Sequence, residues 1–281
     1  MKRTSKIYDV GMLPELGTVP EKMYAWALRN DRLGEPINAF RQELIDVPEP
    51  GYGEVLTANM SAGINYNGVW AALGKPKNVI DNNGNYDDKK ENFHICGSEA
   101  SAIVYAVGEG VTRVKVGDRI IVGAAQYDLS CPVIRSGEDY VCSPTFHVWG
   151  YEGNWGAFAQ FSKVKEYQCE PYPDGLDWAE ASCLTAAGVP VYRMLTHWTP
   201  NNVKQGDVVL IYGGTGGVGS IAIQLSAYFG AIPIAVVSSE EKGQLCMKLG
   251  AKGYINRRNF GHWGRLDGYL EPDKQRKWTT E

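Results

Sequence analysis

The first part of the chain alternates short apolar runs with turn residues. Such runs lie between about Met23 and Ile121 and are separated by Gly and Pro: KMYAWAL, GEVLTANMSAGIN, SAIVYAVG and DRIIVGA. Runs of this length with these separators are typical of β-strands. The stretch VGEGVTRVKVGDRIIV adds two glycine turns between apolar runs, which indicates hairpin-like pieces of a small barrel. We expect the segment from Gln126 to His147 to be a long loop.

After Tyr172 the periodicity changes. Asp177 and Glu180 have capping-box spacing at the start of DWAEASCLTAAGVPVYRML, which is apolar at helical intervals. Strand and helix patterns then alternate through DVVLIYG, GVGSIAIQLSAYFG, IPIAVVSS, EEKGQLCMKLG and GYIN, and stop beyond Asn256. This order is typical of a parallel, doubly wound sheet. We predict an α/β protein with a β-barrel domain over residues 1–190 and the first half of a dinucleotide-binding domain over residues 191–281.

Composition and charge narrow the function classes. Of the 281 residues, 44% are hydrophobic and 21% are charged, and the formal net charge is −4. These values, without any Lys/Arg-rich block, argue against a nucleic-acid partner or an anionic membrane surface. The apolar runs are far shorter than the ~20 residues that a membrane helix needs. Asp9, Pro14 and Glu15 stand where a signal peptide would be apolar, so we expect a cytoplasmic protein.

Neither the cysteines nor the histidines are spaced as metal ligands. The six cysteines form no CxxC pair, and the four histidines form no HxH or HxxxH pair. We therefore expect reduced, mostly structural thiols and no metal site.

The most specific motif is the glycine-rich stretch IYGGTGGVGS. It matches GxGxxG, between a predicted strand and a predicted helix, through Gly214, Thr215, Gly216, Gly217, Val218 and Gly219. In a dinucleotide site the first glycine permits a tight turn, the second lets backbone N–H groups approach the pyrophosphate, and the third lets the helix pack on the strand. We assign these roles to Gly214, Gly216 and Gly219. The alternative is a plain glycine-rich turn.

The end of the second strand indicates which cofactor would bind. NAD sites usually place Asp or Glu there to bind the ribose 2′-hydroxyl. This chain has Ser238 and Ser239, with Lys242 one helical turn further and Arg257 after the third strand. These groups could surround a 2′-phosphate, so we predict NADPH as the cofactor. The glutamates after Ser239 weaken this unless they cap the next helix, and Arg257 with Arg258 could instead be a solvated basic pair.

Two stretches of the first domain carry polar groups in apolar surroundings. In GINYNGVW, the amides of Asn65 and Asn67 could fix a turn or donate to a ligand carbonyl. In WGYEGNWGAF, Glu152 lies among aromatic residues, where it could hold a proton or a water, or form a turn with its carboxylate in solvent. The residue types alone leave both alternatives open.

A barrel followed by a sheet with a Gly-Gly-Val-Gly loop resembles the medium-chain dehydrogenase/reductase superfamily, which joins a GroES-like domain to a Rossmann domain. Five stretches make the resemblance narrower: VPEKMYAWALRNDRLGEP, AGINYNGVWAALGKP, FHICGSEASAIVYAVGEGV, SPTFHVWGYEGNWGAFAQF and YRML. Together they are similar to crotonyl-CoA carboxylase/reductase and its near relatives. Gly97-Ser98-Glu99 stands where the zinc-dependent members have Gly-His-Glu, which matches the zinc-free branch.

This resemblance implies hydride transfer from NADPH to the β-carbon of a short-chain enoyl-CoA thioester, followed by attack of the α-carbon on CO2. It implies that Asn67 holds the CO2, that Glu152 orders a water beside it, and that Tyr151 shields the site. The family usually has Phe at position 151 and Thr or a similar residue at position 153, and this chain departs from it at both positions with Tyr151 and Gly153. A non-carboxylating reductase, such as the acryloyl-CoA-reducing domain of a propionyl-CoA synthase, is one alternative. A truncated, non-catalytic nucleotide-binding fragment is another.

The resemblance also implies chain beyond Glu281, including the rest of the sheet and a histidine that holds the same water. We therefore expect this chain to be a fragment of a longer protein. Enzymes that it resembles are commonly homo-oligomers, so we expect one here for the whole protein.

Overall fold

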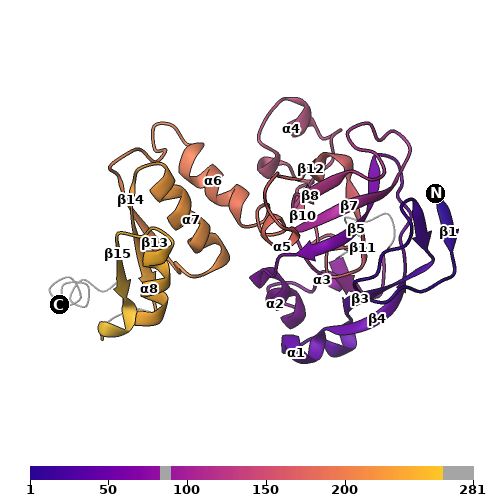
Figure 1. The fold of residues 1–281 in the computed structure, drawn as a ribbon, viewed down its shortest axis with the longest axis horizontal. Coiled ribbons are helices and arrows are strands. Elements are labelled where there is room, and N and C mark those ends of the chain that lie inside the picture. Colours follow the sequence, from indigo (N-terminus) through magenta and orange to yellow (C-terminus); the bar gives the residue numbers. More distant parts are fainter. Residues whose placement is uncertain (83–89, 262–281) are drawn as a thin grey trace. The chain divides into compact units, whose positions relative to one another are not determined.

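The computed structural model describes residues 1–82 and 90–261, which belong to two compact units, Met1–Ala186 and Ala187–Glu281 (Figure 1). The domain boundary that we predict, after residue 190, lies inside helix α6 (Gly188–Thr196).

The first unit is built on antiparallel β-sheets that enclose an apolar interior. A five-stranded sheet has the order β11 (Phe161–Lys165), β5 (Glu54–Ala62), β7 (Ala100–Val107), β8 (Arg119–Val122) and β12 (Cys169–Pro171). A three-stranded sheet has the order β4 (Arg41–Asp46), β3 (Lys22–Leu28) and β6 (His94–Ile95). Outside these two sheets, β1 (Lys2–Thr4) pairs in parallel with β2 (Thr18–Pro20). The predicted apolar runs all form strands, and in β5 and β7 consecutive residues such as Val55 and Leu56 are fully buried, so both faces of these strands are covered.

Short helices connect these strands. They are α1 (Pro36–Ala39), α2 (Tyr66–Leu73), α3 (Val79–Asn82), α4 (Pro132–Arg135) and α5 (Trp178–Ala181), with a 3₁₀ turn at Asn30–Arg32 and another at Glu166–Gln168. Helix α2 begins at the segment that carries the predicted asparagines and ends at Gly74, which has a φ of 63°.

The segment between Gln126 and His147 is more ordered than the predicted loop. Its ends pair as strands β9 (Ala125–Gln126) and β10 (His147–Val148), and it contains α4 and a 3₁₀ turn at Tyr140–Cys142. Tyr127 stacks on Tyr140 and Tyr167, with ring centroids 5.2 and 4.7 Å away. Contacts between distant residues therefore order a segment that shows no periodic pattern.

The predicted helix from Asp177 starts as expected but is interrupted. Asp177 and Glu180 form the capping box, yet α5 ends at Ala181 and α6 begins only at Gly188. Between them, the Thr185 hydroxyl donates to the carbonyl of Val122 (2.6 Å) and the Ala186 N–H donates to Glu99 (2.7 Å). The chain bonds to the barrel here instead of continuing the helix.

The second unit has the predicted order of strands and helices. Parallel strands β13 (Val208–Tyr212), β14 (Ile232–Val237) and β15 (Gly253–Asn256) lie in that order in one sheet. The connecting helices are α7 (Gly217–Tyr228) and α8 (Glu240–Lys248), and a 3₁₀ turn follows at Arg257–Asn259. A cluster that includes Ile223, Ala235 and Cys246 forms its core. The glycine-rich loop therefore runs from the end of β13 to the start of α7 (Figure 1).

Candidate functional site

The glycine-rich loop turns at one residue before the predicted position. Gly213 has a φ of 68°, and its carbonyl accepts the N–H of Gly216 at 2.9 Å. A Cβ on Gly214 would lie 2.8 Å from Cβ of Ala235 and 2.9 Å from Sγ of Cys246, which is too close for a side chain. The assignment of the tight turn to Gly214 is therefore wrong: Gly213 makes the turn, and Gly214 permits close packing against the second strand and α8.

The other two glycines of the motif lie at the start of α7. A Cβ on Gly219 would collide with the carbonyl of Gly213, so its absence lets α7 approach the loop. Gly216 is the N-cap of α7, which continues through Gly217 and Val218. The first N–H groups of a helix have no partner within it and lie at the positive end of its dipole, which suits an anion such as a pyrophosphate.

A pocket of about 180 Å³ lies beside this loop at the carboxyl ends of β13 and β14. Four of the predicted cofactor residues line it together: Thr215, Ser238, Lys242 and Arg257. The other four lining residues were not predicted. Tyr212 and Gly213 directly precede the motif, and Val236 and Val237 lie at the end of β14.

The charges of this pocket suit a phosphate. The Nζ of Lys242 lies 3.4 Å from the hydroxyl of Ser238. Within residues 1–82 and 90–261, neither Lys242 nor Arg257 forms an ion pair with a carboxylate. Two cations that lack an internal counter-charge can bind a phosphate without first breaking an ion pair.

The neighbouring polar residues have structural partners. Ser239 is the N-cap of α8 and accepts the N–H of Lys242 at 3.3 Å, so it is a capping residue and does not line the pocket. Glu240 accepts hydrogen bonds from the Tyr254 hydroxyl (2.6 Å) and from the Asn256 amide (2.9 Å). These bonds lower the pKa of Glu240, whose carboxylate is thus held by the third strand.

The two asparagines of the first unit differ in their partners. Asn65 stands at the N-cap position of α2, and its amide donates to Oε1 of Glu99 at 2.8 Å. Glu99 is buried, and its other oxygen accepts the N–H of Ala186 at 2.7 Å. Asn67 lies in the first turn of α2 and makes no side-chain hydrogen bond to any described residue. The Asn65 amide is therefore bonded to a buried carboxylate, whereas the Asn67 amide can still bind a ligand.

Both oxygens of the Glu152 carboxylate have partners. Oε2 accepts the backbone N–H of Val148 at 2.9 Å, and Oε1 accepts from Nζ of Lys77 at 2.6 Å. The Glu152 side chain is 20% exposed, so it is not the solvated turn residue of the alternative interpretation. Sequence patterns did not point to Lys77, because it lies 75 residues away.

Tyr151 packs at the edge of an apolar cluster. This cluster includes Ala71 and Ala72 of α2, and the Phe158 ring. Burial raises the pKa of Tyr151. The cluster and the Lys77–Glu152 ion pair therefore connect the Glu152 loop with α2, the helix that carries Asn67.

Gly153 lies against a buried polar pair. Nε2 of His147 is 3.0 Å from Oε1 of Gln126, and a Cβ on Gly153 would lie 3.0 Å from the same oxygen and 3.1 Å from Cδ2 of His147. Burial lowers the pKa of His147, while the Thr145 carbonyl and the Glu152 charge act in the opposite direction. This pair occupies the space that a larger residue at position 153 would need.

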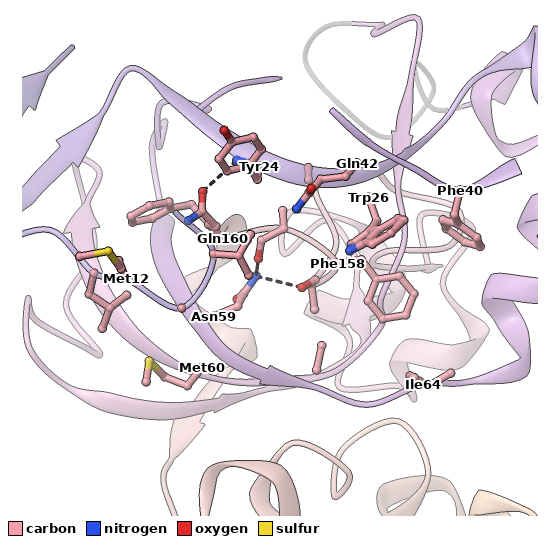
Figure 2. Close-up of a pocket in the computed structure, with 18 residues that line it drawn as sticks. Met12, Tyr24, Trp26, Phe40, Gln42, Asn59, Met60, Ile64, Phe158 and Gln160 are labelled. Carbon is pink, nitrogen blue, oxygen red and sulfur yellow. Dashed lines mark hydrogen bonds between the residues drawn. The ribbon is translucent and has the colours of Figure 1, made fainter. Parts of the chain in front are cut away.

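The first unit also contains a larger cavity of about 610 Å³ (Figure 2). Its polar residues are largely bonded within the protein: the Asn59 amide donates to the Ala159 carbonyl at 2.8 Å, and Oε1 of Gln160 accepts the N–H of Tyr24 at 2.8 Å. The remaining lining is mostly apolar and includes Met12, Trp26, Phe40, Met60, Ile64 and Phe158. None of the predicted catalytic residues lines this cavity.

The part of the chain that the structure describes contains no group of three or more His, Cys, Asp and Glu placed to hold a metal ion. His94 is buried, His147 bonds to Gln126, and His197 packs edge-on against Trp198, whereas His262 lies outside the described residues. All six cysteines are free. No described helix is both long and apolar enough to cross a membrane.

Comparison with known proteins adds independent information. Residues 51–174 match the family model of the alcohol dehydrogenase GroES-like domain. The chain is 44% identical over 275 residues to a crotonyl-CoA carboxylase/reductase of Cereibacter sphaeroides. It is 52% identical, with a TM-score of 0.90, to the crotonyl-CoA carboxylase/reductase AntE in complex with NADP. It is 32% identical, with a TM-score of 0.82, to the 2-octenoyl-CoA carboxylase reductase CinF in complex with NADP and 2-octenoyl-CoA.

These matches cover nearly all of this chain but only part of the relatives. The Cereibacter protein matches 98% of this chain, which spans 62% of that protein's length. AntE likewise matches 98% of this chain, which spans 67% of AntE, and the corresponding values for CinF are 93% and 62%. The predicted fold class, a GroES-like domain followed by the first strands of a doubly wound sheet, is confirmed.

Proposed function

The chain belongs to the crotonyl-CoA carboxylase/reductase family, and we propose that it serves the NADPH-dependent reductive carboxylation of a short-chain enoyl-CoA. The observation that carries this proposal is the pocket beside the glycine-rich loop, where Ser238, Lys242 and Arg257 come together. The relatives in complex with NADP support the choice of cofactor.

The residues of the second unit fit NADPH. The backbone N–H groups at the start of α7, from Gly217 to Gly219, would bind the pyrophosphate. Lys242 and Arg257 would hold the 2′-phosphate, and the Ser238 hydroxyl would donate to it. When bound, NADPH supplies the hydride that reduces the β-carbon of the enoyl thioester.

The residues of the first unit would act on the carbon that becomes nucleophilic. Asn67 would donate from its amide to one oxygen of CO2, because this amide has no partner among the described residues. Glu152 would accept a hydrogen bond from a water beside the CO2. Tyr151, which packs against α2, would keep other water away, because an enolate in wet surroundings takes a proton before it attacks CO2.

An assay of the whole protein to which this chain belongs, with NADPH, crotonyl-CoA and bicarbonate, tests this proposal. We expect oxidation of NADPH, followed by absorbance, and a product whose mass includes one added carboxyl group. A saturated acyl-CoA without that group would indicate the non-carboxylating reductase. Saturable binding of NADPH without turnover would indicate the non-catalytic nucleotide-binding protein, and the absence of NADPH binding would contradict all three functions.

A further inference from the structure

Lys77 lies beside Glu152, at the proposed CO2 site of the first unit. No sequence motif points to this cation. Its Nζ lies 2.6 Å from Oε1 of Glu152, and the two side chains are only 37% and 20% exposed. Lys77 follows helix α2, and Val79 and Ile80, just after it, belong to the same apolar cluster as Tyr151. Its backbone is therefore anchored next to the Glu152 loop, which distinguishes this pair from a surface salt bridge between two mobile side chains.

The ion pair and one backbone bond together fix the carboxylate. Lys77 binds Oε1, while the N–H of Val148 binds Oε2 at 2.9 Å. A carboxylate has about four lone-pair positions, so two of them remain for other donors. Because both protein partners are donors, the carboxylate of Glu152 is oriented as an acceptor for a third donor, such as a water.

The orientation of that water decides between two products. An enolate can attack CO2 or take a proton from its surroundings. A water that donates to Glu152 directs one O–H group toward the carboxylate and away from the enolate. If the carboxylate could turn freely, the water would be less ordered and protonation would compete more effectively.

We propose that Lys77 is a positioning residue that holds Glu152 as the acceptor for this water and thereby favours carboxylation of the enolate over its protonation. This inference rests on the proposed function. It assigns Lys77 no contact with the substrate or the cofactor, so its effect passes through Glu152.

The ratio of carboxylated to saturated product, measured by mass spectrometry, tests this role. We expect Lys77→Met to lower the ratio about tenfold, the effect of losing one charge-assisted hydrogen bond, while NADPH oxidation changes less than about threefold. Lys77→Arg should restore most of the ratio, because it keeps the charge. Lys75→Met is the matched control, since Lys75 is exposed and forms no ion pair with a described residue. In a Glu152→Gln background, Lys77→Met should have no further effect.

A second measurement does not depend on activity. If Lys77 positions Glu152, then Lys77→Met should raise the amide hydrogen exchange rate of Val148 about tenfold, whereas Lys75→Met should leave it unchanged. Unchanged exchange at Val148 would overturn the positioning role. Faster exchange with an unchanged product ratio would overturn the role in product choice. If the wild-type chain gives only the saturated product, the proposed carboxylation fails, and the role in product choice fails with it, while the exchange data still decide whether Lys77 positions Glu152.

Discussion

Removal of the cations beside the glycine-rich loop should weaken NADPH binding and leave NADH binding nearly unchanged. The perturbations are Lys242→Ala, Arg257→Ala and the double variant. Both side chains line the pocket of about 180 Å³, and neither is paired with a carboxylate of the described chain. NADH lacks the 2′-phosphate, so it serves as an internal control for the shape of the rest of the site.

The expected loss of NADPH affinity follows from the surroundings of the two cations. Two unit charges ~4 Å apart interact by about 1 kcal/mol in water and by about 4 kcal/mol near a protein surface. The pocket is open to solvent, so we take about 1.5–2 kcal/mol for each cation, in the range of a hydrogen bond to a charged group. Each single variant should therefore raise the Kd for NADPH about 10- to 30-fold, and the double variant more than about 100-fold.

Fluorescence titration with NADPH and NADH at two salt concentrations measures these effects. The NADPH affinity of the wild-type chain should fall as salt rises, and that dependence should be smaller in the double variant. Lys248→Ala, in the last turn of α8, is the matched control, because it removes a lysine from the same helix outside the pocket. Equal loss of NADPH and NADH affinity would refute recognition of the 2′-phosphate and would point to damage of the fold.

Three further predictions concern stability. Burial lowers the pKa of His94 to about 4 from its ordinary 6.5, so between these pH values the unfolded chain binds a proton that the folded chain does not. The free energy of unfolding, measured by urea titration, should fall by about 3 kcal/mol as pH falls through this window, and it should fall less in His94→Leu. An equal fall with pH in the two proteins would contradict the role of His94. Gly214→Ala should destabilise the second unit by about 1–3 kcal/mol in thermal melts, because its Cβ would overpack the core, whereas Gly217→Ala, whose Cβ would lie 3.7 Å from its nearest neighbour, should be tolerated. Asn154→Ala should lower the free energy of unfolding by about 3 kcal/mol, since the buried Asn154 amide accepts from two backbone N–H groups and donates to one carbonyl. A loss of stability no larger than that of Asn201→Ala, at an exposed position, would contradict this structural role of Asn154.

Local sequence patterns were sufficient to predict the order of strands and helices in the second unit. A strand, a glycine turn and a helix follow one another within about 20 residues, so their order in the chain is also their order in space. The pocket residues Thr215, Ser238 and Lys242 could be predicted together for that reason. The exact turn residue could not, because Gly213 and Gly214 are adjacent and only their backbone angles distinguish a turn from close packing.

The first unit is different because its contacts join distant residues. Lys77 and Glu152 are 75 residues apart, and Gln126 and His147 are 21 apart across a segment without periodicity. Neither pair can be predicted from the local pattern of apolar and polar positions. The resemblance to a known family pointed to Glu152, but only the tertiary structure could identify the cation that binds it.

Asn65 and Asn67 illustrate how the structure resolves a choice that residue types leave open. Both are amides in the same apolar stretch, and either could donate to a ligand. Asn65 precedes α2 and has an extended backbone, whereas Asn67 lies in the first turn of the helix. Glu99, buried 34 residues further along, binds the amide of Asn65 at 2.8 Å. A buried carboxylate needs such donors, so the Asn65 amide is committed to the fold. The amide of Asn67 forms no such bond within the described chain, and it is therefore the one that we propose as the donor to CO2.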